Sequence, residues 1–173
     1  MARILIVEDE GIVAMDIRRI VQEVGYEVVA IADSGAEGVK QARSLQPDLV
    51  LMDIHLEDQT AGIRAAEAIY SELGIPIIYT TANTDDATLE EVEQSVPFTI
   101  IAKPIMENQL KPNIRMALYR HELEMRLTQF QLFMEMVNRH SQIASLLEEY
   151  LSALEVHMPI AAAGIQIPGK PGE

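Results

Sequence analysis

The 173-residue sequence contains no cysteine. This absence excludes a disulfide framework and thiolate chemistry, and it fits a reducing compartment. Long apolar runs are also absent: RILIV, DLVLMDI and IPIIYTTA have the length of strands and are too short to span a membrane. The amino terminus enters a strand pattern at once, without the features of a signal peptide. We therefore expect a cytoplasmic protein.

Positive charge is scarce, since 13 lysine and arginine residues face 27 aspartate and glutamate residues, for a formal net charge of −14. Residues 1–106 hold 19 acidic and 7 basic side chains, whereas residues 107–173 hold 8 and 6. An acidic surface repels phosphate backbones and anionic lipid, and the near-neutral C-terminal part has no basic stripe. We therefore expect neither nucleic acid nor a membrane as a partner.

What the sequence has in quantity is apolar residues, at 49% of the chain, and these alternate between two periodicities over the first hundred residues. Five runs rich in isoleucine, valine and leucine are typical of strands buried on both faces; they lie at residues 3–7, 27–32, 48–52, 76–80 and 98–102. Apolar residues at helical spacing separate the runs, namely Ile12, Met15 and Ile20, then Val39 and Ala42, then Ala65, Ala68 and Ile69, then Leu89 and Val92. Asp33 and Ser34 are candidate helix caps. Alternating strands and helices predict a doubly wound α/β domain around a parallel sheet.

From about residue 108 the pattern is helical throughout, and Pro112 fits the beginning of a helix. The spacing allows one long amphipathic helix, or two helices with a break near residues 128–131 or 139–141. Apolar side chains at 125–136 need a partner, which could be the first domain, a second helix or another subunit. The last segment, rich in proline and glycine, predicts a loose tail. We expect a first domain at residues 1–120, a helical extension at 121–157 and a flexible tail at 158–173.

Polar side chains follow four of the predicted strands. They are Glu8, Asp9 and Glu10 after the first, Asp53 after the third, Thr80 and Thr81 after the fourth, and Lys103 after the fifth. The carboxyl ends of parallel strands share one edge of the sheet, so these groups should meet there. Close carboxylates raise one another's pKa unless a cation joins them, and an all-oxygen ligand set suits Mg²⁺. With a lysine and a hydroxyl beside it, such a site predicts phosphoryl transfer to a carboxylate. The alternative is that the first three acidic residues only cap the next helix.

The segments VEDE, LMDIHL, YTTAN and IAKPI, in this order and spacing, resemble the signature of the response-regulator receiver domain (CheY-like) of two-component signalling. The resemblance covers roughly residues 2–120, about two thirds of the chain. It implies a five-stranded flavodoxin-like sheet of strand order 2-1-3-4-5. It also implies Mg²⁺ as cofactor and a histidine kinase as partner.

By this resemblance, Asp53 is the phosphoacceptor and also a ligand of Mg²⁺. Asp9 matches the direct ligand of the metal, and Glu8 matches the residue that holds it through water. The backbone carbonyl of His55 would be a further ligand.

Thr81 matches the family's switch hydroxyl, because a small residue, Ala82, follows it; Thr80 is the neighbouring alternative. Lys103 matches the family's lysine, and its bond to Pro104 would be cis.

Two positions depart from the family pattern. Ile100 stands three residues before the lysine, where receivers commonly carry tyrosine or phenylalanine. In the loop after the phosphoacceptor, Glu57 replaces a common proline, and one more residue precedes Gly62. His55 and Asn83 flank the expected path of an attacking water.

The sequence thus favours a response regulator that is phosphorylated on Asp53 and lacks a recognisable DNA-binding or enzymatic output domain. No enzymatic activity is expected beyond its own phosphorylation and dephosphorylation. Signalling would pass through partner binding, or through a homodimer formed by the C-terminal helices or by the face of the fourth and fifth helices. One alternative is a transcription regulator with an atypical helical nucleic-acid-binding domain. Another is a phosphotransfer module of a hybrid kinase, since His121-Glu122-Leu123 resembles the phosphorylated His-Glu-Leu of histidine kinases. The simpler interpretation of His121, and also of His140, is a surface histidine on a linker helix.

Overall fold

The computed structural model describes residues 1–56, 61–82 and 99–157, with the side chains of 141, 144, 147, 151 and 153–157 excepted. The chain divides into two compact units, one ending at Met125 and the other beginning at Arg126. The expected fourth helix, with Leu89 and Val92, and the expected tail lie outside the described residues.

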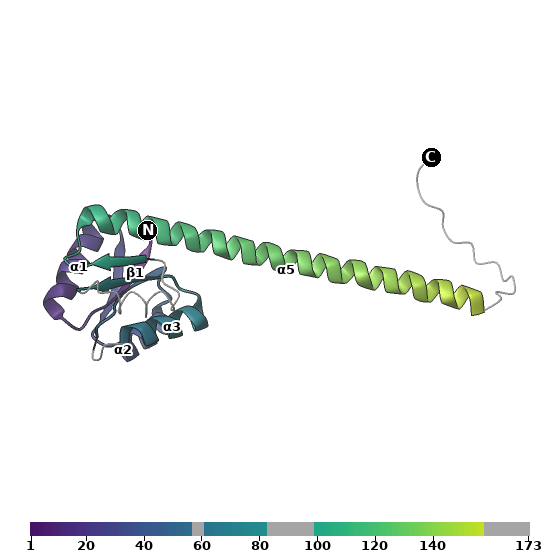
Figure 1. Cartoon of the computed structure of the whole chain (residues 1–173), viewed down its shortest axis with the longest axis horizontal. Helices are drawn as coiled ribbons and strands as arrows, with labels where there is room; N and C mark the ends of the chain where they lie inside the picture. Colours follow the sequence, from purple (N-terminus) through teal and green to yellow (C-terminus); the bar gives the residue numbers. More distant parts are fainter. Residues whose placement is uncertain (57–60, 83–98, 158–173) are drawn as a thin grey trace. The chain divides into compact units, whose positions relative to one another are not determined.

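The first unit is built on one five-stranded sheet of order β2-β1-β3-β4-β5 (Figure 1). Its strands are β1 (Arg3–Val7), β2 (Glu27–Ala32), β3 (Leu49–Asp53), β4 (Ile77–Thr81) and β5 (Thr99–Ala102). All four neighbouring pairs are parallel. The predicted fold and strand order are confirmed. The order reverses between β1 and β3, and in open α/β sheets ligands bind at the carboxyl ends of the strands beside such a reversal.

Helices cover both faces of this sheet (Figure 1). They are α1 (Gly11–Glu23), α2 (Gly35–Leu45), α3 (Ala61–Leu73) and the first turns of α5 (Glu107–His157). Val7, Met52 and Tyr79 face α2 and α3 and pack with Ala42 and Ile69 there. On the opposite face, the alternate strand residues Ile6, Leu51 and Ile78 pack with Ile17 of α1 and Ile114 of α5. Alternation along each strand therefore gives the domain two apolar layers.

The first predicted helix is present, but its apolar residues do not all lie on its buried face. Ile12 and Met15 are 89% and 57% exposed. The buried residues of α1 are instead Ala14, Ile17, Ile20 and Val21. In α2 the predicted cap is confirmed, since the Ser34 side chain accepts a hydrogen bond from the Glu37 N–H.

The C-terminal pattern forms one continuous helix, α5, so the two-helix alternative is excluded. Pro112 is the sixth residue of α5 and lies in its second turn. Leu110, Ile114 and Ala117 bury this part of α5 against the sheet. In the described part of the chain, no helix is both long enough and apolar enough to cross a membrane.

Candidate functional site

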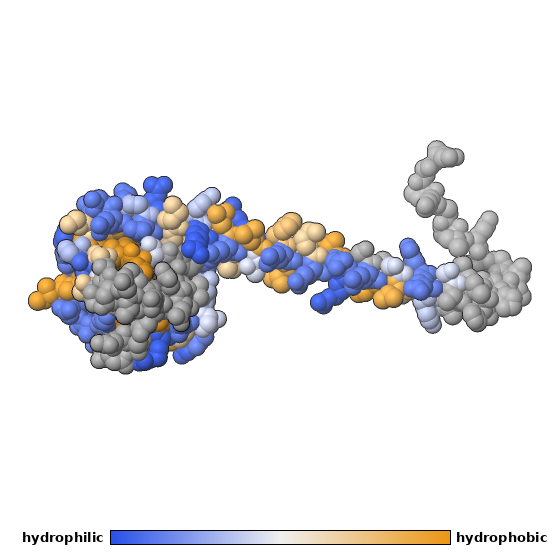
Figure 2. Space-filling view, in the orientation of Figure 1, coloured by the Kyte–Doolittle hydropathy of each residue, from blue (hydrophilic) through white to orange (hydrophobic). Residues whose placement is uncertain are grey.

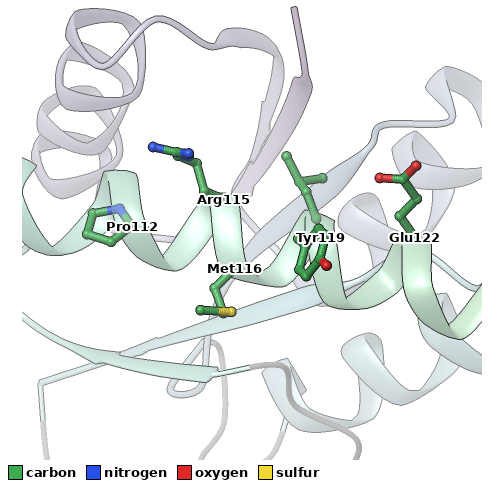
Figure 3. Close-up of a pocket in the computed structure, with 6 residues that line it drawn as sticks. Pro112, Arg115, Met116, Tyr119 and Glu122 are labelled. Carbon is green, nitrogen blue, oxygen red and sulfur yellow. The ribbon is translucent and has the colours of Figure 1, made fainter.

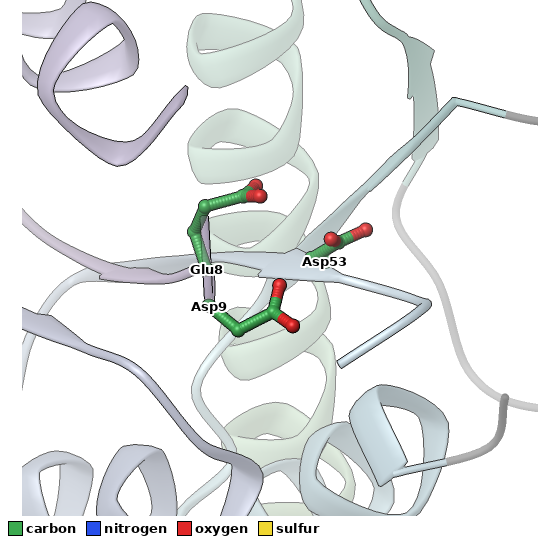
Figure 4. A group of neighbouring side chains, drawn as sticks. All are labelled: Glu8, Asp9 and Asp53. Atoms are coloured by element: carbon green, nitrogen blue, oxygen red, sulfur yellow. The ribbon is translucent and has the colours of Figure 1, made fainter. Parts of the chain in front are cut away.

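Three carboxylates meet at the edge of the sheet where the strand order reverses (Figure 4). Glu8 and Asp9 follow β1, and Asp53 ends β3; one oxygen of each lies within 4.8 Å of those of the other two. Val7 pairs with Met52, so Glu8 stands level with Asp53. Glu8 and Asp53 are only 1% and 3% exposed, whereas Asp9 is exposed. The cluster is thus buried on the protein side and open on the solvent side.

The lysine that directly follows β5 contacts the two buried carboxylates of the cluster. Lys103 Nζ donates to Asp53 Oδ2 at 2.8 Å and to Glu8 Oε1 at 2.9 Å, and it lies 2.8 Å from Glu8 Oε2. The Lys103 N–H donates to the Thr81 carbonyl at 2.7 Å, which fixes the end of β5 beside β4. Lys103 and Pro104 are joined by a cis peptide bond, as predicted. Burial alone would lower the pKa of Lys103, but hydrogen bonds and charge from Asp53 and Glu8 raise it above its ordinary value.

Glu8 has the largest change in acidity at this site. Burial raises its pKa to about 7; the hydrogen bond from Lys103 opposes this rise, and the Asp53 charge adds to it. Its buried Oε2 atom has one cationic neighbour among the described residues, Lys103 Nζ at 2.8 Å, and makes no further hydrogen bond there. A buried carboxylate that shares one lysine with a second carboxylate, beside a third, can also accept a metal ion or a metal-bound water. The donor set is all oxygen, and one side is open to water, so these residues fit Mg²⁺.

The two threonines of β4 lie at the same edge of the sheet and are both buried, at 1% and 0% exposure. Thr80 pairs with Asp53 in the β3–β4 register. Strand alternation puts Thr81 on the other face of the sheet, the one that carries Tyr79. Tyr79 pairs with Ile100, which is partly buried against that layer of the core. The residue at the family's aromatic position therefore shares a sheet face with Thr81.

Backbone groups after β3 hold the Asp53 carboxylate. The His55 N–H donates to Asp53 Oδ1 at 3.3 Å, and the Ile54 N–H donates to the Thr80 carbonyl at 3.1 Å. Glu57 and Asn83 lie outside the described residues.

Sequence reasoning missed the part that Gly62 plays beside this loop. A Cβ on Gly62 would overlap the Asp53 carbonyl oxygen and would lie 2.8 Å from the Ile54 carbonyl oxygen. The backbone of α3 therefore touches the backbone that carries Asp53. A glycine near the start of a predicted helix was the signal for this close approach.

The helix-cap interpretation of the acidic run receives no support from α1. Glu10 is the N-cap residue, and its side chain makes no capping hydrogen bond. Glu8 instead pairs with Lys103 at the edge of the sheet.

A hollow of about 430 Å³ adjoins the cluster; it is lined by Glu8, Asp9, Gly11, Ala14, Met15, Ile31, Ala32, Asp33, Glu37 and Gln41. A larger hollow of about 600 Å³ lies along α5 (Figure 3). It is lined by Pro112, Arg115, Met116, Leu118, Tyr119 and Glu122, and so it includes none of the predicted site residues.

Five parallel strands in this order, with a carboxylate cluster and a lysine at the reversal point, define a doubly wound α/β protein with a magnesium-type site. Residues 4–115 match the family described as Response regulator receiver domain. The chain therefore belongs to the receiver-domain family of two-component response regulators.

Several relatives are similar over the same length of chain. The transcriptional regulatory protein PdtaR of Mycobacterium tuberculosis is 36% identical over 118 residues, which cover 68% of this chain and 57% of PdtaR. The phyllosphere-induced regulator PhyR of Methylorubrum extorquens is 34% identical over 117 residues, covering 67% of this chain and 43% of PhyR. The chain thus spans about half the length of these relatives.

Solved structures of receiver domains are also similar to this chain. The receiver domain of a modulated diguanylate cyclase from Desulfovibrio desulfuricans G20 superimposes with a TM-score of 0.68 at 33% identity, covering 72% of this chain and 98% of that one. A CheY-like receiver protein from Methanospirillum hungatei JF-1 superimposes with a TM-score of 0.64 at 27% identity, over 72% and 98% of the two chains.

Proposed function

We propose that this chain is a response regulator that accepts a phosphoryl group on Asp53 from a histidine kinase. The observation that carries the proposal is the contact of Lys103 Nζ with both Asp53 and Glu8 inside a cluster of three carboxylates. The Asp53 carboxylate needs one neighbouring cation to offset its own negative charge. It needs a second cation to offset the negative charge of the incoming phosphoryl group. Glu8, Asp9, Asp53 and the His55 carbonyl would hold Mg²⁺ as that second cation.

In the proposed reaction, an Asp53 carboxylate oxygen attacks the phosphorus of a phosphohistidine. A P–O bond forms and the P–N bond breaks, and the imidazole keeps the electron pair and takes up a proton. Bound Mg²⁺ would supply positive charge that offsets the repulsion between the phosphoryl oxygens and the carboxylates. Lys103 Nζ, 2.8 Å from Asp53 Oδ2, can move its hydrogen bond to a phosphoryl oxygen. The Thr81 hydroxyl is the proposed second donor.

The experiment that tests this role uses acetyl phosphate with Mg²⁺ and measures intact mass. The wild-type chain should gain one phosphoryl group, which water attack on the acyl phosphate later removes. Asp53→Asn should gain none, whereas Asp16→Asn, which alters an exposed aspartate of α1 outside the cluster and its adjoining hollow, should be labelled normally. Complete loss of label in Asp53→Asn would also exclude His121 as a direct acceptor. A wild-type chain that is never labelled would contradict the proposal.

We propose residues 1–120 as the receiver and 121–157 as the extension that passes on the signal, by partner binding or by dimerisation. A role in transcription is the second candidate, because relatives include PdtaR and the DNA-binding response regulator MtrA of Mycolicibacterium smegmatis. Their names describe whole proteins of which this chain spans 57% and 53%. The near-neutral extension argues against phosphate contacts. Salt-dependent binding of the full chain to a fluorescent DNA duplex or RNA hairpin would favour this candidate.

A further inference from the structure

The part of α5 beyond the receiver exposes every side chain that the structure describes, from Met125 to Ser152. Many of these side chains are large and apolar, and Figure 2 shows them gathered along the helix. Phe130 and Phe133 are 61% and 54% exposed, and Val137 is 46% exposed. A helix of this kind gains little stability from propensity alone and depends on covering its apolar face. Something must therefore cover this one.

Six of the exposed apolar residues of α5 follow a seven-residue repeat. Met116, Leu123, Phe130 and Val137 recur every seven positions, and Tyr119 and Phe133 stand three positions after members of that series. We call these six residues the seam. Arg126 and His140 occupy the equivalent positions in the other repeats. A sustained repeat of this kind is the pattern by which helices pair along their length, and a few polar positions within it set the register.

The receiver's own core does not cover the seam. At the start of α5 the buried residues are Leu110, Ile114 and Ala117. At about 100° per residue, this buried side of α5 lies on the order of 150° around the helix from Met116 and Tyr119. Both of these seam residues line the open hollow of Figure 3 instead. The start of α5 thus packs on the sheet with one side and exposes Met116 and Tyr119 on another.

The surroundings of the seam favour a partner with the same surface. Charged residues lie beside the first half of the seam, among them Arg120 and Glu122, but residues 127–147 contain only Glu135 and Arg139, and neither belongs to the seam. Helices that select a different partner do so mainly through charges beside the seam, and here the neighbours include Leu127, Met134 and Ile143. Around Phe130, Phe133 and Val137 the seam and its neighbours carry little charge, and an apolar surface of regular period is complementary to a second copy of itself.

The area available is sufficient for a stable interface. Aromatic side chains bury about 150–250 Å² each, so the exposed halves of Phe130 and Phe133 from two copies provide on the order of 400 Å². The aliphatic members of both seams bring the total to roughly the 1,000 Å² that a specific interface needs.

We propose that the seam of α5 binds a second copy of this chain. This deepens the proposed function, because it identifies the partner of the extension; only the signalling role of the assembly rests on that function. Phosphorylation of Asp53 and assembly through the seam can each fail without the other.

The test is the mass of the full chain in solution by light scattering, at tens of micromolar. Wild type should have the mass of two or more chains. Phe130→Glu and Val137→Glu, which each add a charge to the seam, should have the mass of one chain. Gln142→Glu adds the same charge at an exposed position outside the seam and should keep the wild-type mass.

A wild-type chain with the mass of one chain would overturn the proposal, as would seam variants that keep the wild-type mass. A Gln142→Glu chain that dissociates as far as the Phe130→Glu and Val137→Glu chains would also overturn the proposal. Labelling by acetyl phosphate is measured on the same samples. Monomeric seam variants that are still labelled at Asp53 support the proposal, because their receiver is then folded and only the assembly is lost.

Discussion

At the scale of single residues, the site is a balance between one lysine and two buried carboxylates. Glu8 and Asp53 both contact Lys103 Nζ, yet the pKa of Glu8 is still raised to about 7. One lysine therefore does not offset the burial of two negative charges, and the site retains capacity for a further cation.

This imbalance predicts how stability depends on pH in the absence of Mg²⁺. The pKa of Glu8 is about 7 in the folded chain against an ordinary value of 4.5, so between these values the folded chain binds more protons than the unfolded chain. The free energy of unfolding should therefore fall as pH rises from about 4.5 to about 7, by up to roughly 3 kcal/mol. Thermal melts at pH 5.5 and pH 8 measure this. Added Mg²⁺ should stabilise more at pH 8, where Glu8 is charged, and Glu8→Gln should flatten the pH profile; a wild-type profile as flat as that of the variant would contradict the assignment.

Removal of the lysine should be more damaging than loss of any surface ion pair. Lys103→Met leaves two buried carboxylates without their cation, so we expect the free energy of unfolding at pH 8 to fall by about 3–5 kcal/mol. Urea denaturation measures the change. Lys40→Met is the matched control: it breaks the exposed, solvent-screened pair with Glu37 and should change the free energy of unfolding far less than Lys103→Met does. Equal losses in the two variants would show that the Lys103 contacts contribute no more than a surface pair.

At the scale of helices and strands, most of the fold could be predicted because the signals are local. A continuous apolar run bounded by turn residues predicts a buried strand, and all five strands lie within one residue of their predicted bounds. The strand ends then place Glu8, Asp53 and Lys103 together, which is why the cluster was predictable as well. The burial of Ala14 in place of Met15 could not be predicted from the sequence, because it depends on how closely α1 packs on the sheet.

The contact of Gly62 with the β3 backbone likewise depends on tertiary approach, and it yields an element-scale prediction. Gly62→Ala should push α3 away from the Asp53 and Ile54 carbonyls and destabilise the chain by about 1–3 kcal/mol or more. It should also slow labelling by acetyl phosphate. Gly11→Ala, which has no atom within 4 Å of the added carbon, should be neutral or slightly stabilising. Urea denaturation and labelling rates compare the two, and an unimpaired Gly62→Ala chain would refute the close packing.

At the scale of the whole molecule, the chain combines a unit that has its own core with a second unit whose described helical side chains are exposed. The sequence left open whether the extension was one helix or two, because spacings of three and four continue across either candidate break without a stop signal. The backbone of α5 continues through both of them.

The two units should therefore be separable. A chain that ends at residue 125 retains both apolar layers of the receiver, so we expect it to fold, to be labelled on Asp53 and to have the mass of one chain. Circular dichroism, labelling and light scattering would establish this. A truncated chain that still associates would place the interface within residues 1–125 and not on Phe130, Phe133 and Val137.

The continuity of α5 from a buried face to an exposed one gives this helix two sources of amide protection against hydrogen exchange. Amides near Leu110 and Ile114 are shielded by the receiver, so their exchange should report its opening and stay independent of protein concentration. Amides near Phe130 and Val137 have the hydrogen bonds of the helix itself and gain further protection only when the seam is covered, so their exchange should slow as concentration rises. One dilution series on one helix would thus record folding at its amino-terminal end and assembly further along, with each segment serving as the reference for the other.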